Sequence, residues 1–177
     1  MGDAGMKLVV LWRRPEVRFL VLFLVILAVA FTTVALRPVN DAVVVPYTRW
    51  VAAVSARVLN VLGQNVSRHG CSLSSPRFSV TIYNGCNGLI ATLILLSGVL
   101  AFPARWSGKV IGVVGGVLVM EVINLIRIVS LFYIGVYFPK LFNQAHIFVW
   151  QSIVILSSVV LWIVWARTFG TVPPGDA

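Results

Sequence analysis

Four long apolar runs, separated by polar segments, set the organisation of this chain. The first, at residues 17–36, carries no charge after Arg18, and about 20 apolar residues are enough to cross roughly 30 Å of hydrocarbon. The other runs lie at about residues 88–102, 111–137 and 145–166. The pattern predicts an all-α integral membrane protein with about four transmembrane helices, forming a single membrane-embedded domain over residues 1–177.

The segment at residues 39–85 follows a different pattern. Within residues 47–62, aliphatic and aromatic side chains recur every three or four positions, which predicts an amphipathic helix lying at the membrane surface. Such a helix either caps the bundle or handles substrate, and the sequence leaves both roles open. At residues 78–82, apolar and hydroxyl side chains alternate between turn residues, so we expect a short β-hairpin to lead into the next membrane helix.

The composition supports a membrane location. Hydrophobic residues make up 59% of the chain and charged residues only 11%, with a mean hydropathy of +0.98, whereas soluble domains are about half apolar and a quarter charged. The net charge of +9 could suggest nucleic acid as a partner, but the basic residues flank the apolar runs and form no basic domain. We therefore expect contact with membrane lipid and no binding of nucleic acid.

The placement of the basic residues also predicts an orientation. Those that precede the first run, lie between the second and third runs, or follow the fourth are Lys7, Arg13, Arg14, Arg18, Arg105, Lys109 and Arg167. By the positive-inside rule these positions face the cytoplasm, which places residues 39–85 at the outer face of a cell inner (cytoplasmic) membrane. Four arginines within that outer segment weaken this argument without reversing it, since the first helix usually dominates.

Cys86 is the first of three reactive side chains that come from three separate runs and lie toward the predicted outer face. It precedes a predicted helix, where the positive end of the helix dipole favours the thiolate and therefore nucleophilicity. Asn–Gly pairs on both sides of it allow a tight turn and a close backbone approach. Cys71 offers an alternative, because on the oxidising side of the membrane the two thiols can form a disulfide that removes the nucleophile.

Arg127 lies inside a predicted membrane helix, ten residues before Tyr137. An arginine within the hydrocarbon costs about 2.5 to 3.5 kcal/mol on insertion scales, so it normally faces the bundle interior and serves a function. Asn124 and Glu121 precede it at intervals of three residues and form a polar stripe with it. Asn124 is expected to orient Arg127 or to line the site. A purely structural explanation of the stripe is that Glu121 serves as the countercharge of Arg127.

His146 opens the last run and is a weak signal by itself, but the three side-chain types together fit acyl transfer from a peptide. That reaction needs a nucleophile, a proton carrier and a donor for the oxyanion, which Cys86, His146 and Arg127 can supply. The sequence holds no CxxC, HExxH, GxGxxG or Walker motif, so we expect neither a metal nor an organic cofactor.

In this order, the residues resemble the exosortase/archaeosortase family of membrane transpeptidases. The resemblance extends from about Arg68 to Trp165 and rests on Tyr83-Asn84-Gly85-Cys86-Asn87-Gly88-Leu89, Asn124-Leu125-Ile126-Arg127-Ile128 and His146. The short chain is most similar to the compact exosortase H branch, although larger members of the family carry extra helices that are missing here.

The resemblance implies that Cys86 is the nucleophile, Arg127 the oxyanion stabiliser and His146 the general acid/base. Residues expected to bind substrate or to support the site are Tyr83, Asn87, Gly88 and Asn124. The implied substrates are exported proteins whose C-terminal sorting signal consists of a short motif, a transmembrane helix and a basic cluster. The enzyme would cut near that motif through a thioester and pass the acyl group to an acceptor.

Two other classes of function stay open. A non-catalytic membrane subunit of an export or assembly complex would use the stripe of Glu121, Asn124 and Arg127 as a buried polar contact between helices. A small transporter would line its pathway with the same stripe, although four helices are few and the internal repeat of many transporters is not evident.

Overall fold

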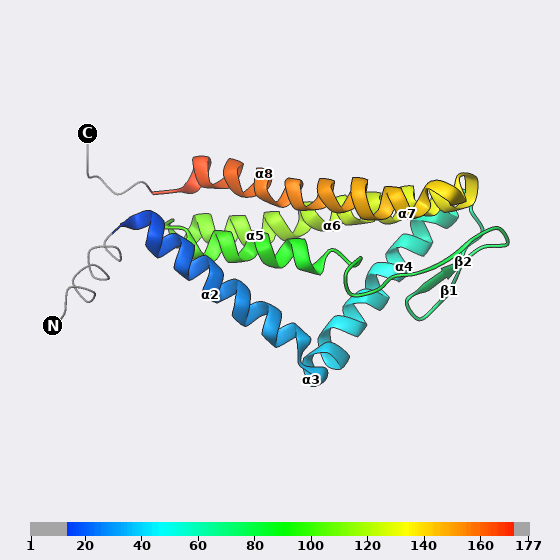
Figure 1. Ribbon diagram of the computed structural model, residues 1–177, viewed down its shortest axis with the longest axis horizontal. Coiled ribbons are helices and arrows are strands. Elements are labelled where there is room, and N and C mark those ends of the chain that lie inside the picture. The colour runs from blue at the N-terminus through cyan, green and yellow to red at the C-terminus, as the bar shows by residue number, and fades with distance from the viewer. Residues whose placement is uncertain (1–13, 172–177) are drawn as a thin grey trace.

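A computed structural model of the protein describes residues 14–171, and two of the basic residues named above, Lys7 and Arg13, lie outside them. The described chain is a helical bundle with a small sheet at one end (Figure 1). Its longer helices are α2 (Pro15–Ala35), α4 (Val45–Val61), α5 (Leu89–Ala101), α6 (Trp106–Tyr137) and α8 (Gln151–Phe169). Short helical turns precede two of them: α3 (Arg37–Val39) and the π-helix η1 (Asn40–Val44) before α4, and the 3-10 helix η2 (Pro139–Leu141), α7 (Phe142–Gln144) and the π-helix η3 (Ala145–Trp150) before α8.

Four continuous helical stretches are long and apolar enough to cross a membrane: Pro15–Ala35, Arg37–Val61, Trp106–Tyr137 and Pro139–Phe169. This confirms the predicted helical membrane protein. The set differs from the predicted one in one member. The run at residues 88–102 forms α5, which has 13 residues and is about 20 Å long, shorter than the hydrocarbon layer. The stretch that contains the predicted amphipathic helix, α4, takes its place by length and composition.

Two helices begin earlier than the apolar runs predict. α6 starts at Trp106 instead of near residue 111, because Ser107, Gly108 and Lys109 lower the hydropathy without interrupting the backbone helix. The last helical stretch begins at Pro139 instead of residue 145. α6 therefore has 32 residues and a length of about 48 Å, well beyond the roughly 30 Å of a hydrocarbon core.

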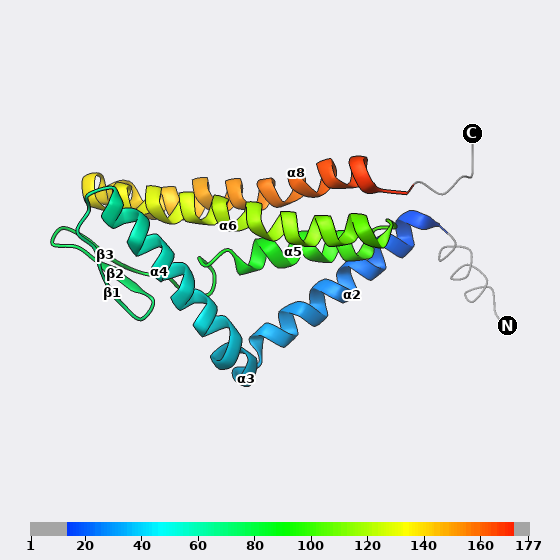
Figure 2. The same cartoon turned by 180° about the vertical axis from the view of Figure 1, so that it is seen from behind.

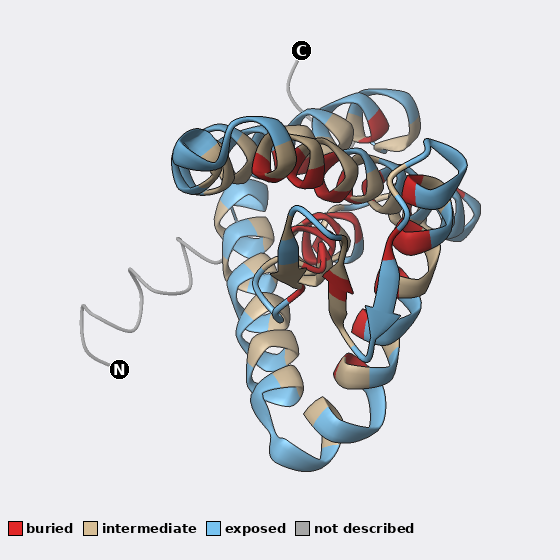
Figure 3. Ribbon diagram, turned by 90° about the vertical axis from the view of Figure 1, so that its right-hand side faces the viewer, coloured by how far each residue is buried: buried red, intermediate tan, exposed pale blue. Residues whose placement is uncertain are grey.

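α5 lies inside the bundle and contacts α2, α6 and α8. Its buried side chains pack with residues of α6 and α8 in one apolar cluster: Ala91, Leu95, Val99, Met120, Val154 and Trp165. By contrast, α2 has no buried residue. It diverges from α5 along its length and meets α4 in a V, and the buried positions of the other helices face inward (Figures 1 and 3).

The predicted hairpin is a three-stranded antiparallel sheet in the order β1-β2-β3 (Figure 2). Its strands are β1 (Ser67–His69), β2 (Ser72–Ser74) and β3 (Ser79–Thr81). The sequence missed β1 because all three of its residues are exposed and polar, so no alternation marks it. The inner face of the sheet packs through Leu73 and Ile82 against α4 and the distal part of α6, where Leu59 and Phe132 complete a second apolar cluster.

Candidate active site

Cys86, Arg127 and His146 converge on one point although they come from three separate elements. Cys86 lies in the turn between β3 and α5, Arg127 inside α6, and His146 in η3. His146 Nε2 lies 2.8 Å from Cys86 Sγ, and Arg127 Nη2 lies 3.9 Å from the same sulfur. An imidazole and a guanidinium therefore lie beside one thiol sulfur, the three side-chain types that acyl transfer can use.

The three residues line a cleft of about 280 Å³. One wall consists of β3 and the two residues that follow it, Ile82 and Tyr83. The opposite wall is apolar and consists of Ile128, Leu131 and Phe132 of α6 and Phe142 of α7. The Phe142 ring stacks on the His146 imidazole, with centroids 6.0 Å apart and planes 16° apart, which limits rotation of the imidazole.

The turn that carries Cys86 is held by hydrogen bonds on several sides. The Cys86 N–H donates to the Tyr83 carbonyl at 2.8 Å, and the Tyr83 side chain itself is 70% exposed. Asn87 is fully buried: its Nδ2 donates to Thr48 Oγ1 at 2.9 Å, and its Oδ1 accepts the first N–H of α5 at 3.1 Å. Tyr47 Oη lies 3.0 Å from the Asn87 carbonyl oxygen. Asn87 thus fixes the turn that orients the thiol.

Gly88 and Asn124 form the close contact between this turn and α6. Gly88 has a φ of +82°, in the left-handed region that favours glycine. A Cβ at this position would lie 2.8 Å from Asn124 Cγ. Asn124 is 1% exposed, and neither polar atom of its amide has a hydrogen-bond partner among the described residues. Asn124 therefore packs under the turn, and it makes no hydrogen bond that would orient Arg127.

Arg127 is 2% exposed and finds its polar partner on α8. Its Nη2 donates to Gln151 Oε1 at 3.4 Å, while its Nε has no partner within the described part of the chain. Glu121 instead accepts a hydrogen bond from the Tyr47 hydroxyl and forms no ion pair with Arg127. The explanation of Glu121 as a countercharge is therefore wrong, and the guanidinium keeps donor capacity beside the sulfur.

Gln151 is the residue that sequence reasoning left out of the site. It follows His146 by five residues, a spacing that would separate the two side chains by about 140° on a regular α-helix. The π-helical turn η3 lies between them and changes this angle, so His146 contacts Cys86 while Gln151 contacts Arg127. The polarity of Gln151 within an apolar run is its only signal in the sequence.

Burial raises the pKa of the Cys86 thiol above its ordinary value, and the positive charge of Arg127 opposes this shift only in part. Burial therefore acts against the expected effect of the helix dipole, which is to favour the thiolate. Cys86 lies three residues before Leu89, the first residue of α5, and it is half-buried, so its desolvation favours the neutral form. Burial thus favours the neutral thiol beside the His146 imidazole.

Both cysteines are free thiols in the structure, so the alternative disulfide is not formed. Cys71 lies at the turn between β1 and β2, where its carbonyl accepts the N–H of Ile82 at 3.0 Å. Within residues 14–171, no cluster of three or more His, Cys, Asp or Glu side chains could hold a metal ion.

A comparison with protein families gives a match over most of the chain. The family described as transmembrane exosortase (Exosortase EpsH) matches residues 4–166, a range that contains all three side chains around the sulfur. This confirms the family predicted from the three motifs. Neither the curated proteins nor the solved structures give a match.

Proposed function

Because the chain belongs to the transmembrane exosortase family, we propose that it is a membrane-embedded cysteine transpeptidase. It would cleave the C-terminal sorting signals of exported proteins and transfer the exported proteins to an acceptor. The observation that carries this proposal is the convergence of Cys86, His146 and Arg127 on one cleft. A polar contact that only joins helices does not need a thiol within hydrogen-bond distance of an imidazole. Acyl transfer does.

The reaction begins with transfer of the Cys86 proton to His146 Nε2. The sulfur then attacks the scissile carbonyl carbon, a C–S bond forms, and the carbonyl oxygen takes the negative charge. When this intermediate collapses, the C–N bond breaks and His146 returns the proton to the leaving amine. The exported protein is left as a thioester on Cys86, and its membrane anchor departs with the new amino terminus.

The second half of the reaction regenerates the enzyme. An acceptor nucleophile gives its proton to His146 and attacks the thioester carbonyl. The C–S bond breaks, the acyl group passes to the acceptor, and the Cys86 thiolate recovers its proton from His146. Water in place of the acceptor gives hydrolysis by the same steps.

Arg127 supports both halves because each passes through an oxyanion. Its Nη2 is 3.9 Å from the sulfur, too far for a strong hydrogen bond in the resting state. When the carbonyl carbon of the substrate is bonded to that sulfur, however, its oxygen can lie between the sulfur and Arg127 Nη2. One donor aimed at an oxyanion in a water-poor site contributes about 3 kcal/mol or more. The same Nη2 also donates to Gln151 Oε1, which helps to hold the guanidinium in place.

Exposed apolar side chains support a site at the membrane boundary. On α6 they extend from Trp106 to Ile126, with only Tyr137 beyond. This band is about 30 Å long, the thickness of the hydrocarbon core, and it stops one residue before Arg127. On η3 and α8 the corresponding band runs from Ile147 to Val164 and begins directly after His146. The last turns of α6 then project beyond the hydrocarbon, which lowers the cost of burying Arg127.

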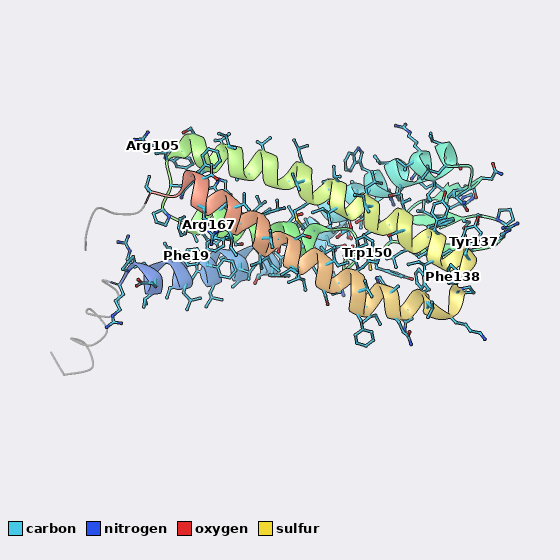
Figure 4. All side chains as sticks on the ribbon, turned by 90° about the horizontal axis from the view of Figure 1, so that it is seen from above. Phe19, Arg105, Tyr137, Phe138, Trp150 and Arg167 are labelled. Atoms are coloured by element: carbon cyan, nitrogen blue, oxygen red, sulfur yellow. The ribbon has the colours of Figure 1, made fainter. Side chains whose placement is uncertain are left out.

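The basic residues support the outer face as the location of the site. Arg105 and Arg167 lie at one end of the bundle, and Tyr137 and Phe138 lie at the other, beside the cleft residue Phe142 in the chain (Figure 4). The positive-inside rule assigns the arginine end to the cytoplasm. A substrate delivered across the inner membrane and retained by its own helix would meet the cleft on that outer side.

The test is processing of a co-expressed exported protein that carries a C-terminal motif, transmembrane helix and basic cluster. Wild type is compared with Cys86→Ala, and Cys71→Ala is the matched control for loss of a thiol. We expect cleavage with wild type and Cys71→Ala and none with Cys86→Ala, at equal membrane levels. Equal processing by wild type and Cys86→Ala, or none by wild type with several such substrates, would favour the non-catalytic subunit instead.

A further inference from the structure

β3 is an edge strand whose free side forms one wall of the cleft. The order β1-β2-β3 gives β3 a partner on one side only. Residues 79–83 all line the cleft, together with Cys86, whereas none of its lining residues within the described chain belongs to β1 or β2. The unpaired side of β3 therefore faces the thiol.

The register of the sheet identifies which residues of β3 bond to β2. The Phe78 carbonyl accepts the N–H of Ser75 at 2.8 Å, and the Ile82 N–H donates to the Cys71 carbonyl at 3.0 Å. Val80 lies between them in the same register. Since hydrogen-bonded pairs alternate with non-bonded pairs in an antiparallel ladder, residues 78, 80 and 82 turn their backbone groups toward β2.

Ser79 and Thr81 consequently turn their backbone N–H and C=O groups away from β2. Their side chains support this assignment, because the two hydroxyls lie 2.8 Å from those of Ser74 and Ser72, the close approach typical of non-hydrogen-bonded pairs. No backbone hydrogen bond from a described residue satisfies these outward groups. The cleft wall thus offers two donors and two acceptors in the spacing of a β-ladder.

We propose that the scissile segment of the substrate binds as an added strand on β3, pairing with the backbone of Ser79 and Thr81 and presenting its carbonyl carbon to Cys86. This inference rests on the proposed function, and it names how that site holds its substrate. An exposed strand edge is a template for an extended peptide, whose main-chain hydrogen bonds supply affinity. The scissile peptide must in any case be extended to expose its carbonyl to the sulfur.

The two edges of the sheet differ in a way that fits this role. Proteins protect free edges from unwanted pairing with charged side chains. On β1, Arg68 is opposite Leu73 and therefore turns its backbone groups outward, so the edge away from the cleft carries a charge. On β3 the outward positions are Ser79 and Thr81, which are small and uncharged. The edge beside Cys86 is the one left open to a peptide.

Specificity follows from the same geometry. Successive side chains of an added strand point to opposite faces of the sheet. One face continues that of Val80 and Ile82, which packs toward Phe132 and the apolar core. Alternate positions of the substrate segment are therefore expected to be apolar, and the positions between them are expected to accept many kinds of side chain.

Proline variants of the enzyme test the strand directly, because proline removes an N–H and is accepted at an edge where that N–H is not in the ladder. Ser79→Pro and Thr81→Pro each delete one cleft-side N–H, and Arg68→Pro is the matched control on the opposite edge. We expect processing of the co-expressed substrate to slow about tenfold in each cleft-side variant and to stay unchanged in the control, at equal membrane levels. Unchanged processing by both cleft-side variants would overturn the inference.

A proline scan of the substrate gives a second result that does not depend on folding of an enzyme variant. Substituted singly through the residues around the cut, proline should block cleavage by wild type at every second position, where the N–H pairs with β3, and be tolerated between them. A scan without this alternation would overturn the added strand even if the enzyme variants fail to accumulate. Failure of the proposed function is distinct, because cleavage by wild type would then be absent or independent of Cys86.

Discussion

The two ends of the helical bundle are built by different means. At the end that holds Arg105 and Arg167, aromatic rings pack onto helix backbones at glycine positions. A Cβ on Gly98 would lie 2.7 Å from the Trp162 ring, and one on Gly112 would collide with Trp165. Trp165 Nε1 also donates to the Gly108 carbonyl at 2.8 Å. Close packing of this kind is one of the forces that drive helix association in membranes.

The end that holds the cleft has one such contact, Phe78 against Gly135, but it also buries several strongly polar side chains. Asn87, Asn124 and Arg127 are each at most 2% exposed. Four buried side-chain polar atoms in the described chain lack a partner: two belong to Asn124, one is Arg127 Nε, and the exception at the packed end is Trp162 Nε1. Unpaired buried polar groups lower stability. We infer that the end with Arg105 and Arg167 stabilises the bundle, while the cleft end gives up some stability for the proposed chemistry.

Arg127→Met should separate the two roles most strongly. The variant loses the proposed oxyanion donor, so processing should fall about a hundredfold or more. Its thermal stability in detergent should stay equal or rise, because an incompletely paired buried charge is replaced by an apolar side chain. Arg127→Lys keeps the charge without the forked donors and should retain more activity. A loss of stability as large as the loss of activity would mean that Arg127 holds the bundle together.

The sequence predicted some parts of this architecture better than others. Apolar runs predicted the membrane helices, since hydropathy reports burial in lipid directly. They placed the start of α6 too late, because Ser107, Gly108 and Lys109 are helical without being apolar. They also gave residues 88–102 the same weight as the other runs, although the structure has there a helix of only 13 residues that packs inside the bundle. Hydropathy does not report where a helix begins and ends, or whether a short helix is buried by packing against its neighbours.

For the site, the sequence identified the residue types but not their partners. Cys86, Arg127 and His146 stood out because reactive groups are rare in so apolar a chain. The pairing of Glu121 was predicted wrongly because a stripe along one helix does not include Tyr47, which is 74 positions away. Gln151 was missed because its approach depends on the π-turn η3, which no hydropathy pattern announces. Partners across elements come from tertiary packing alone.

Gly112→Val should produce the opposite outcome to Arg127→Met. Its added side chain meets the Trp165 ring, so the free energy of unfolding should fall by about 1 to 3 kcal/mol. Processing per folded molecule should be unchanged, because the cleft lies at the other end. Gly115→Val is the matched control on the same helix, where a Cβ meets nothing within 4 Å. Thermal unfolding in detergent and processing normalised to membrane level measure the two effects.

The smallest expected effect concerns the charge state of Cys86. Burial raises the pKa of this thiol, so the thiolate is the minor form at neutral pH and its fraction grows as the pH rises. In a Cys71→Ser background, the rate of alkylation by a neutral reagent should therefore increase with pH through the ordinary range for thiols. Arg127 favours the thiolate, so Arg127→Met should raise the pKa further and move the curve to higher pH.

Gly112→Val should leave the dependence of the Cys86 alkylation rate on pH unchanged. Alkylation therefore tests whether the two ends of the bundle act independently. If both variants shift the curve equally, the ends are coupled through the bundle and the division of roles fails. A rate that is already at its plateau below neutral pH would mean that the thiolate and imidazolium form a stable ion pair at rest. Proton transfer from Cys86 to His146 would then precede substrate binding, and Arg127 would stabilise the sulfur before it stabilises any oxyanion.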